Sequence, residues 1–387
     1  MTKNRLQNLR TWIEIDSGAA KKNYDIFRKL IGPSSAKASK GKPRVKLWAV
    51  VKSNAYGHGL VLFAKLMQKL GVDGLCVDSL VEGVRLRKEG IKKPILVLGP
   101  TLPALYKIAA QNRVTVTVSS FEALKKLAEL KRPPEFHLKI DTGMHRQGFY
   151  LNDLAKVIKV ISNSKFLISK FKGIYTHFAS AKDINYPEYT ERQFAEFQKA
   201  IHLFERAGFD KLVKHAAATG GTLVNPKYRL DAVRVGIGLY GLWPSRELEM
   251  QLGDVIRLEP ILGWKTVVSD VKDLKKGDYI GYDLVERALK PMKVAILPIG
   301  YWHGFPRSLS GTGEMLIRGG RAKVLGRVSM DLVIVALSRP AKPGNIVTII
   351  GRDGREEILA GEVASKARTI HYEFLTRLNP LIERILI

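Results

Sequence analysis

The sequence predicts a (β/α)₈ barrel followed by a second, mostly β domain. In the first two thirds of the chain, short apolar runs alternate with amphipathic segments of helical periodicity. After about residue 250 this periodicity fades, and short β-rich runs are separated by glycines. We therefore expect a barrel domain over residues 1–250 and a β-rich domain over residues 251–387.

Eight apolar runs supply the predicted barrel strands. Their hydrophobicity is nearly continuous, which is typical of strands buried on both faces of a parallel sheet. The runs cover residues 47–51, 74–77, 95–98, 114–118, 136–140, 173–176, 213–217 and 232–235. Strands that alternate with helices favour a barrel of about 240 residues, although a doubly wound open sheet has the same alternation.

The segments between these runs carry apolar residues at helical spacing. Helices are expected over residues 60–70, 80–88, 121–130 and 189–207, and a first helix from a cap at Asp16 or Ser17 to Ile31. A basic loop rich in Gly and Pro covers residues 32–44. In the second domain we expect strands over residues 265–271, 293–297, 314–317, 328–335 and 346–350, and a short helix over 362–367.

Composition narrows the class of protein. The single cysteine, Cys76, lies in an apolar run, so we expect a small core residue and no disulfide. The first ten residues contain no apolar run, and no stretch reaches the roughly 18 apolar residues of a membrane helix. We therefore expect a cytoplasmic protein that has neither a signal peptide nor a membrane span.

The charge balance is strongly basic. Lys and Arg number 64 and Asp and Glu number 36, which gives a net charge of +28. A field of this sign attracts polyanions. The basic residues are nevertheless spread along the chain, and neither a zinc-finger spacing nor an RNA-binding aromatic motif is present. We interpret the charge as a lysine-rich solvated surface, without a specific nucleic-acid partner and without a metal site.

Polar residues that follow the predicted strands mark a candidate active site, because barrel enzymes work at the carboxyl ends of their strands. Lys52 follows the first run. A lysine in an enclosed barrel mouth is poorly solvated, which favours its neutral form and suits a Schiff-base nucleophile; an ordinary surface lysine is the alternative. After the seventh and eighth runs, the hydroxyl of Thr219 and the amides near Gly236 match the usual phosphate cradle of this fold.

Residues 49–59, Ala-Val-Val-Lys-Ser-Asn-Ala-Tyr-Gly-His-Gly, resemble the pyridoxal-phosphate attachment signature of the alanine racemases. The resemblance continues in order through residues 139–148, 176–179, 234–241, 280–282, 297–307, 326–331 and 372–373. Each later segment is weak alone, but together they span nearly the whole chain in a specific order. The resemblance implies an isomerase that interconverts L- and D-alanine through a cofactor aldimine and supplies D-alanine for peptidoglycan.

The resemblance also implies a role for each matching residue. Lys52 would carry pyridoxal phosphate and act as the base on one face of the substrate, and Tyr282 would be the base on the opposite face. In the family this tyrosine comes from the partner subunit, so a homodimer with shared active sites is implied. The other implied cofactor contacts are Tyr56, His177, Thr219, Arg234, Gly236, Ile237 and Tyr372; the substrate contacts are Arg146, Met330 and Tyr301; the supporting residues are Lys139, His215 and Arg327.

Two of these implied roles concern the chemical state of a group in the site. Arg234 would face the pyridine nitrogen of the cofactor and, because arginine stays protonated, would leave that nitrogen unprotonated. Lys139 matches a lysine that is carbamylated in many relatives, where it positions the arginine that corresponds to Arg146.

The sequence departs from the family pattern at several places, so alternatives stay open. Asp283 and Glu286 follow Tyr282 where relatives often have a Gly-rich polar stretch, and Ala218-Thr219 stands where many have Asn-Ser. One alternative is a racemase of the same architecture that acts on serine or lysine. A second is a non-catalytic pyridoxal-phosphate carrier that shares the barrel, which the β-rich second domain argues against.

Overall fold

The computed structural model describes residues 9–32 and 44–387, and the predicted basic loop lies almost wholly outside them. The chain divides into two compact units. The barrel unit comprises Ala19–Ser53 and Phe63–Pro260; the β unit comprises Met1–Gly18, Asn54–Leu62 and Ile261–Ile387. This division differs from the predicted ranges, because the first strand pairs with strands near the other end of the chain and so belongs to the β unit.

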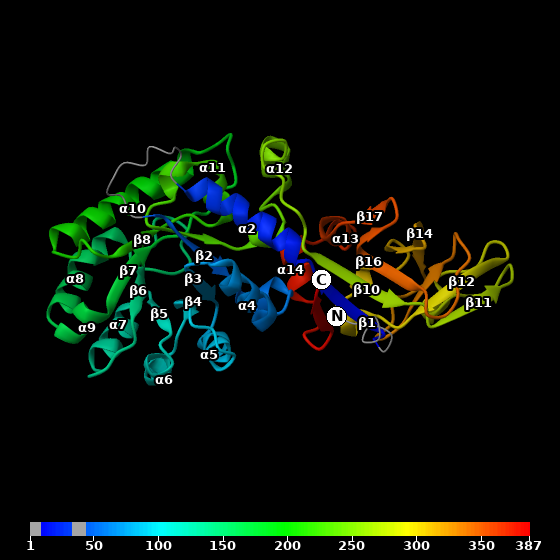
Figure 1. Ribbon diagram of the computed structural model, residues 1–387, viewed down its shortest axis with the longest axis horizontal. Coiled ribbons are helices and arrows are strands. Elements are labelled where there is room, and N and C mark those ends of the chain that lie inside the picture. Colours follow the sequence, from blue (N-terminus) through cyan, green and yellow to red (C-terminus); the bar gives the residue numbers. More distant parts are fainter. Residues whose placement is uncertain (1–8, 33–43) are drawn as a thin grey trace. The chain divides into compact units, whose positions relative to one another are not determined.

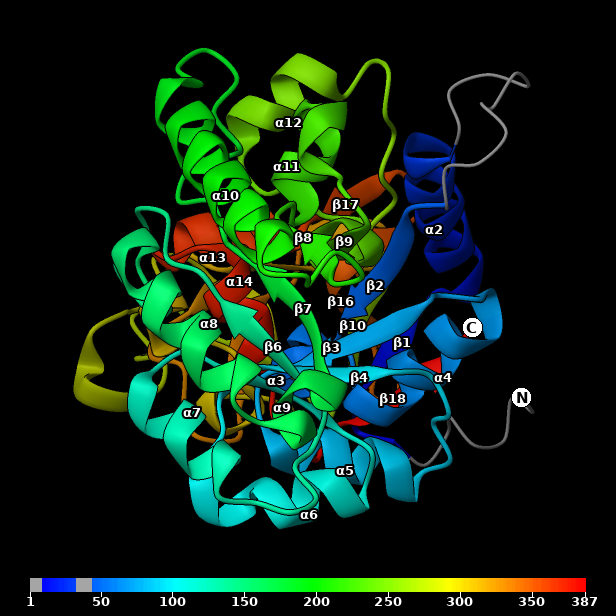
Figure 2. The ribbon, with the colours of Figure 1, turned by 90° about the vertical axis from the view of Figure 1, so that its left-hand side faces the viewer.

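Eight parallel strands form the core of the barrel unit, as predicted (Figures 1 and 2). In chain order they are β2 Lys46–Val50, β3 Gly74–Val77, β4 Ile95–Pro100, β5 Thr115–Val118, β6 Phe136–Lys139, β7 Phe171–Tyr175, β8 Val213–His215 and β9 Ala232–Val235. From β2 to β8 each strand pairs with the next one in sequence, and β9 returns to pair with β2. The ring nearly closes because Asp231 N–H donates to Lys214 O at 3.0 Å and Arg234 N–H donates to Ala217 O at 2.9 Å.

Helices surround this ring of strands (Figure 2). They are α2 Ser17–Ile31, α3 Lys52–Tyr56, α4 Leu60–Leu70, α5 Leu80–Lys88, α6 Tyr106–Gln111, α7 Phe121–Ala128, α8 Leu154–Ser162, α9 Lys165–Lys170, α10 Glu188–Arg206, α11 Thr219–Val224 and α12 Arg246–Leu252. Serine caps begin α5 and α7, where the Ser79 and Ser120 hydroxyls accept bonds from Glu82 N–H and Ala123 N–H. The helix α2 begins at Ser17, so Asp16 stands at the expected cap position, and the Ser17 hydroxyl donates to Ile387 O.

The β unit is built on one mixed sheet with the strand order β11-β12-β15-β14-β13-β16-β10-β1-β18. Its strands are β1 Thr11–Ile15, β10 Leu262–Val267, β11 Asp270–Leu274, β12 Met292–Leu297, β13 Glu314–Ile317, β14 Gly320–Leu325, β15 Val333–Ala336, β16 Ile346–Asp353, β17 Glu356–Ile358 and β18 Glu383–Leu386. Two helices accompany them, α13 Ala360–Lys366 and α14 His371–Thr376.

Two predicted strands of this unit differ from the structure. The run over residues 265–271 is divided between β10 and β11, because β10 pairs with β1 and β16 whereas β11 pairs with β12. The run over residues 328–335 is extended strand only from Val333. Before that point its carbonyl groups accept hydrogen bonds from the segment at Tyr301 and Trp302. Ser329 O accepts from Tyr301 N–H, and Met330 O accepts from Trp302 N–H.

Cys76 is fully buried in β3, which confirms it as a small core residue. Burial raises the pKa of its thiol to about 12. Within the described ranges, none of the helices combines the length and the apolar character that spanning a membrane demands.

Two glycines with left-handed backbone give a test of the barrel unit's packing. Gly241 has φ +77, and a Cβ there would lie 1.7 Å from Glu259 O; Gly208 has φ +86 with nothing within 4 Å. Both substitutions to alanine carry the left-handed penalty of about 1–2 kcal/mol, but Gly241→Ala adds a backbone clash of roughly 2 kcal/mol or more. Urea unfolding should therefore show a clearly larger loss of stability for Gly241→Ala. Equal losses in the two variants would contradict this packing.

Candidate active site

The carboxyl ends of the barrel strands bring together the polar side chains that the sequence singles out in this unit. Lys52 follows β2, Lys139 is the last residue of β6, His177 follows β7, His215 ends β8 and Arg234 lies in β9. Because parallel strands all end on one side of a barrel, these side chains share one end of it.

Arg234 is the centre of this group. Its guanidinium is buried, with the residue 2% exposed. Nη1 donates to His215 Nδ1 at 2.6 Å, and Nη2 donates to Thr176 O at 2.8 Å and Ala216 O at 2.9 Å. The ring of Tyr175 lies 5.0 Å from the guanidinium carbon. Among the described residues no carboxylate lies within ion-pair distance of it, so this buried cation is held entirely by neutral groups.

These hydrogen bonds fix the protonation of two histidines. A guanidinium can only donate, so His215 Nδ1 must accept and its proton must sit on Nε2. His215 Nε2 lies 2.8 Å from His137 Nδ1, to which it therefore donates. His137 thus extends the chain of bonds from Arg234 and keeps its own proton on Nε2. Loss of hydration and the charge of Arg234 lower the pKa of His137 to about 3 and that of His215 well below its usual range.

His137 was not predicted as a site residue, although the sequence carried a signal for it. It stands two residues before Lys139 in β6, and residues two apart point to the same side of a strand. The neighbouring strand β7 makes room for its ring through Gly173, where a Cβ would lie 2.5 Å from His137 Cε1.

Four basic side chains are close enough to His177 to act on its pKa. The loss of hydration lowers the pKa of His177 well below its usual range, and the charges of Lys139, Arg234, Arg146 and Lys52 lower it further. Its Nδ1 lies 3.4 Å from Arg234 Nη2. This end of the barrel therefore has a strongly positive potential around a neutral imidazole.

Lys139 has an unusual environment for a lysine. It is 4% exposed, and its ammonium nitrogen lies 4.8 Å from the centroid of the Tyr175 ring. Burial, followed by the charges of Arg234 and Arg146, lowers the pKa of Lys139 well below the ordinary lysine value. These surroundings therefore favour the neutral amine of Lys139 over its ammonium form.

Asp141 orders the loop that bears Arg146, and this role was also missed from the sequence. Its carboxylate accepts bonds from the N–H groups of Gly143, His145 and Arg146 at 2.9–3.0 Å. Burial raises the pKa of Asp141, but these bonds outweigh it and the pKa is lowered. Arg146 itself is exposed, so its guanidinium is accessible to an anion.

Lys52 begins an unusual turn. Its side chain is 38% exposed, and Nζ lies 3.6 Å from Asp78 Oδ1, so it is better solvated than the sequence argument expected. The next four residues, Ser53 to Tyr56, have φ between 52° and 56°. Four successive non-glycine residues in the left-handed region are rare, since each costs roughly 1–2 kcal/mol. Such strain clusters at functional sites.

A cradle for an anion is formed after β8 and β9. The Thr219 hydroxyl accepts bonds from Gly236 N–H at 3.2 Å and Gly238 N–H at 3.4 Å. The second donor is Gly238, which the sequence interpretation did not name; Ile237 lies between the two donors and begins a 3₁₀ turn. At Gly238 only glycine fits, because a Cβ would lie 2.4 Å from the Phe27 ring.

The other predicted site residues belong to the β unit. Tyr282 and Tyr301 are 66% and 43% exposed, and Met330 is 54% exposed. The segments that bear Tyr301 and Met330 are joined by the main-chain bonds described above. The rings of Tyr56 and Tyr372 lie 6.1 Å apart.

The two acidic residues that follow Tyr282 both interact with other groups of the β unit. Asp283 lies 3.4 Å from Arg327 and 3.9 Å from Arg307. Glu286 accepts a bond from Gly326 N–H. Their charges are therefore partly balanced by the β unit's own groups.

Two family models match the chain, one for the alanine racemase N-terminal domain over residues 15–244 and one for the alanine racemase C-terminal domain over residues 261–386. An alanine racemase of Leptospira interrogans is 35% identical over 385 residues, with 97% of this chain and 96% of the relative covered. The crystal structure of alanine racemase from Bacillus anthracis with bound L-Ala-P has a TM-score of 0.90 at 36% identity, over 98% and 95% of the two chains. A histidine racemase from Leuconostoc mesenteroides has a TM-score of 0.83 at 28% identity, over 98% of each chain.

The buried histidines predict how stability depends on pH. His137 titrates near 6.5 when unfolded but only at about 3 when folded. Below pH 6.5 the unfolded chain therefore binds a proton that the folded chain does not, so unfolding free energy falls as pH drops toward 3. Each such histidine contributes a slope of up to about 1.4 kcal/mol per pH unit. We expect His137→Gln to reduce the slope between pH 6 and pH 5 by about this amount.

The measurement is urea unfolding at a series of pH values. His202→Gln is the matched control, because the His202 side chain is 72% exposed. If His137→Gln and His202→Gln gave the same slope as the parent, His137 would not be held neutral by its surroundings.

Proposed function

We propose that this chain, which belongs to the alanine racemase family, interconverts L-alanine and D-alanine with pyridoxal phosphate as its cofactor. The observation that carries the proposal is the cationic end of the barrel, where Lys52, Lys139, Arg146 and Arg234 surround His177. Such a cluster suits a phosphorylated cofactor together with the carboxylate of an amino acid. The family match gives the class of chemistry, and the cluster supports the choice of residues proposed to perform it.

Three features of the barrel unit fit this cofactor. Arg234 is a buried cation without a carboxylate partner among the described residues, so an electron-rich group beside it would be stabilised. Thr219 and the N–H groups of Gly236 and Gly238 converge in the manner of a phosphate cradle. Lys52 presents a solvent-accessible amine at the end of β2.

Each residue would then have a defined task. Lys52 Nζ would hold the cofactor covalently, and Arg234 would donate to its ring nitrogen; since arginine keeps its proton, that nitrogen remains an acceptor. When bound, pyridoxal phosphate withdraws electrons from the substrate Cα and acidifies its C–H bond. His177 would flank the ring, His215 would support Arg234, and the phosphate would be bound by Tyr56, Thr219, Gly236, Ile237 and Tyr372.

Racemisation needs two proton carriers on opposite sides of Cα. We assign these roles to Lys52 Nζ and Tyr282 Oη. Tyr282 would serve the active site of a second copy, and the β unit supports this dimer with a run of exposed apolar side chains. Those of Tyr279, Tyr282, Leu284, Val285 and Leu289 are 51–79% exposed. Clustered exposed apolar residues mark protein interfaces.

Substrate selection would depend on the groups that bind the substrate carboxylate and on those that line the entrance. Arg146 and the main chain at Met330 would orient the substrate carboxylate, and Tyr301 and Arg327 would narrow the entrance. One extra methylene is worth only about 1–3 kcal/mol of discrimination, so some turnover of serine is compatible with this arrangement. The histidine racemase of similar structure shows that the fold alone does not fix the substrate. D-Alanine is a precursor of peptidoglycan, and we assign this supply role, in the cytoplasm, to the chain.

Lys139 would carry a carbamate in the working enzyme. Its lowered pKa favours the neutral amine, which would add to CO₂ with formation of an N–C bond and release of one proton. The resulting anion would lie among Arg146 and Arg234 and would hold Arg146 in place for the substrate carboxylate.

Isotope labelling tests the carbamate. Protein equilibrated with ¹³C-bicarbonate should show a carbamate carbon resonance that is absent from Lys139→Gln. An active parent enzyme without this resonance would contradict the assignment.

The activity itself is tested by incubating the purified protein and cofactor with L-alanine, L-serine, L-lysine and L-histidine and separating the products by chiral chromatography. D-Alanine should form fastest. Faster formation of another D-isomer would leave the racemase assignment intact and overturn the choice of substrate. If none of the four amino acids racemised, the proposed reaction would be wrong.

Hydrogen exchange at Cα in D₂O separates the two bases. Lys52→Ala should lose racemisation altogether. Tyr282→Phe should lose about 10²–10⁴-fold in racemisation and in exchange from L-alanine, while exchange from D-alanine, served by Lys52, persists. Tyr279→Phe is the matched control, since Tyr279 belongs to the same exposed segment. Full activity of Tyr282→Phe in both directions would refute the two-base assignment.

A further inference from the structure

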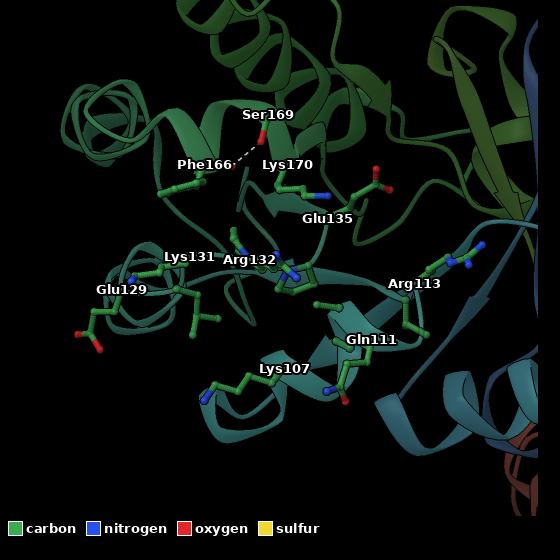
Figure 3. A pocket seen from close by; sticks show the side chains of 16 residues that line it. Lys107, Gln111, Arg113, Glu129, Lys131, Arg132, Glu135, Phe166, Ser169 and Lys170 are labelled. Atoms are coloured by element: carbon green, nitrogen blue, oxygen red, sulfur yellow. Dashed lines mark hydrogen bonds between the residues drawn. The ribbon is translucent and has the colours of Figure 1, made fainter.

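A groove lies at the end of the barrel opposite the candidate active site. It is bordered by α6, the segment after α7, and α9, and it reaches the residues that immediately precede β5, β6 and β7 (Figure 3). Its volume is about 1070 Å³. That is the upper end of the range for small-molecule sites, which is about 300–1,000 Å³. None of the residues assigned to the racemase reaction lines it, so the proposed function leaves it unexplained.

The rim of the groove is cationic. Lys107, Arg113, Lys131, Arg132 and Lys170 line it, and Figure 3 shows Arg132 near its centre. Among the described residues, none of these five side chains lies within ion-pair distance of a carboxylate. Unpaired cations gathered around one hollow favour an anion with more than one charge.

The two acidic residues of the groove do not neutralise this rim. Glu129 pairs with Lys126 at 3.1 Å, and Glu135 lies 3.8 Å from Lys172. Both of these lysines are outside the lining. The carboxylates are therefore engaged by other cations, and the positive charge of the rim persists.

The floor of the groove is apolar. Ala109, Val114, Pro133 and Pro134 are buried beneath it, and Phe166 at its side is 40% exposed. Lys165 Nζ lies over one face of the Phe166 ring, 5.6 Å from its centroid, and leaves the other face for a ligand. An aromatic ring beside cations is typical of sites that stack a base and hold its phosphates. The groove thus offers both cationic contacts at its rim and apolar contacts at its floor, and a simple inorganic anion would use only the first.

We propose that this groove binds a nucleoside di- or triphosphate. The phosphates contact Lys131, Arg132 and neighbouring cations of the rim, and the base packs against Phe166 and the proline floor. Arginine matches phosphate oxygens in a bidentate geometry, which makes Arg132 the principal phosphate contact. The net charge of +28 adds long-range attraction for the same ligand. The limited extent of the groove favours a single nucleotide over a nucleic-acid strand.

Isothermal titration calorimetry tests the proposal with ATP, adenosine and inorganic tripolyphosphate. The protein is first saturated with pyridoxal phosphate, so that the cradle near Thr219 is filled. About 0.15 M salt limits unscreened electrostatic attraction to a Debye length of about 8 Å. We expect one ATP per chain, no detectable binding of adenosine, and at least tenfold weaker binding of tripolyphosphate.

Two variants locate the site. Lys131→Ala/Arg132→Ala should weaken ATP binding at least tenfold while racemase activity is kept. Lys276→Ala/Arg355→Ala is the matched control: it removes the same two charge types from exposed positions of the β unit and should bind ATP as the parent does. Phe166→Ala should weaken ATP binding and leave tripolyphosphate binding unchanged.

Several results would overturn the proposal. Absence of ATP binding at 0.15 M salt would refute it, as would equal losses in the groove and control variants, which would indicate diffuse attraction by the basic surface. Tripolyphosphate that bound as tightly as ATP would refute the nucleotide assignment in favour of a plain polyphosphate site. Since racemase activity is measured on the same variants, failure of the active-site assignment is distinguishable from failure of this one.

Discussion

The arrangement at the carboxyl end of the barrel depends on the burial of Arg234, which has no carboxylate partner in the part of the chain that the structure describes. A buried charge costs several kcal/mol unless its surroundings compensate it. Here the compensation comes from two carbonyl oxygens, an imidazole nitrogen and the face of Tyr175. All of these acceptors must remain uncharged or electron-rich. The guanidinium therefore contributes to keeping neighbouring histidines neutral and Lys139 easily deprotonated.

A second constraint acts where the barrel chain leaves β2. The left-handed turn after Lys52 is unfavourable for four residues in succession. Hydrogen bonds from Gly59 N–H to Asn54 O, from His58 N–H to Ala55 O and from Leu60 N–H to Asn54 Oδ1 offset part of this cost. The same turn ends at Tyr56, which packs near Tyr372 in the β unit. The strained turn thus connects the proposed lysine to a proposed phosphate ligand four residues later.

Much of the fold was predictable from the sequence, because strands buried on both faces leave continuous apolar runs that few other structures explain. All eight barrel strands were predicted on this basis. The strand β1 was not, since its pairing with β10 and β18 depends on residues far along the chain. In the site, strand-end positions predicted Lys139, His215 and Arg234 as neighbours. His137 and Asp141 were not predicted. The role of His137 depends on the space left by Gly173, and that of Asp141 depends on the course of the loop that bears Arg146.

The pairing of β1 also has a consequence for the order of synthesis. Ser17, just after β1, is bonded to Ile387, 370 residues later. At about 5–20 residues per second, the ribosome needs roughly 20–70 s to make the chain between them. During that interval β10 becomes available to one edge of β1, but the edge that pairs with β18 has no partner, while the barrel strands can already pair. The strand β1 therefore completes its pairing only after residues 383–386 have been made, and until then its free edge could pair with another chain.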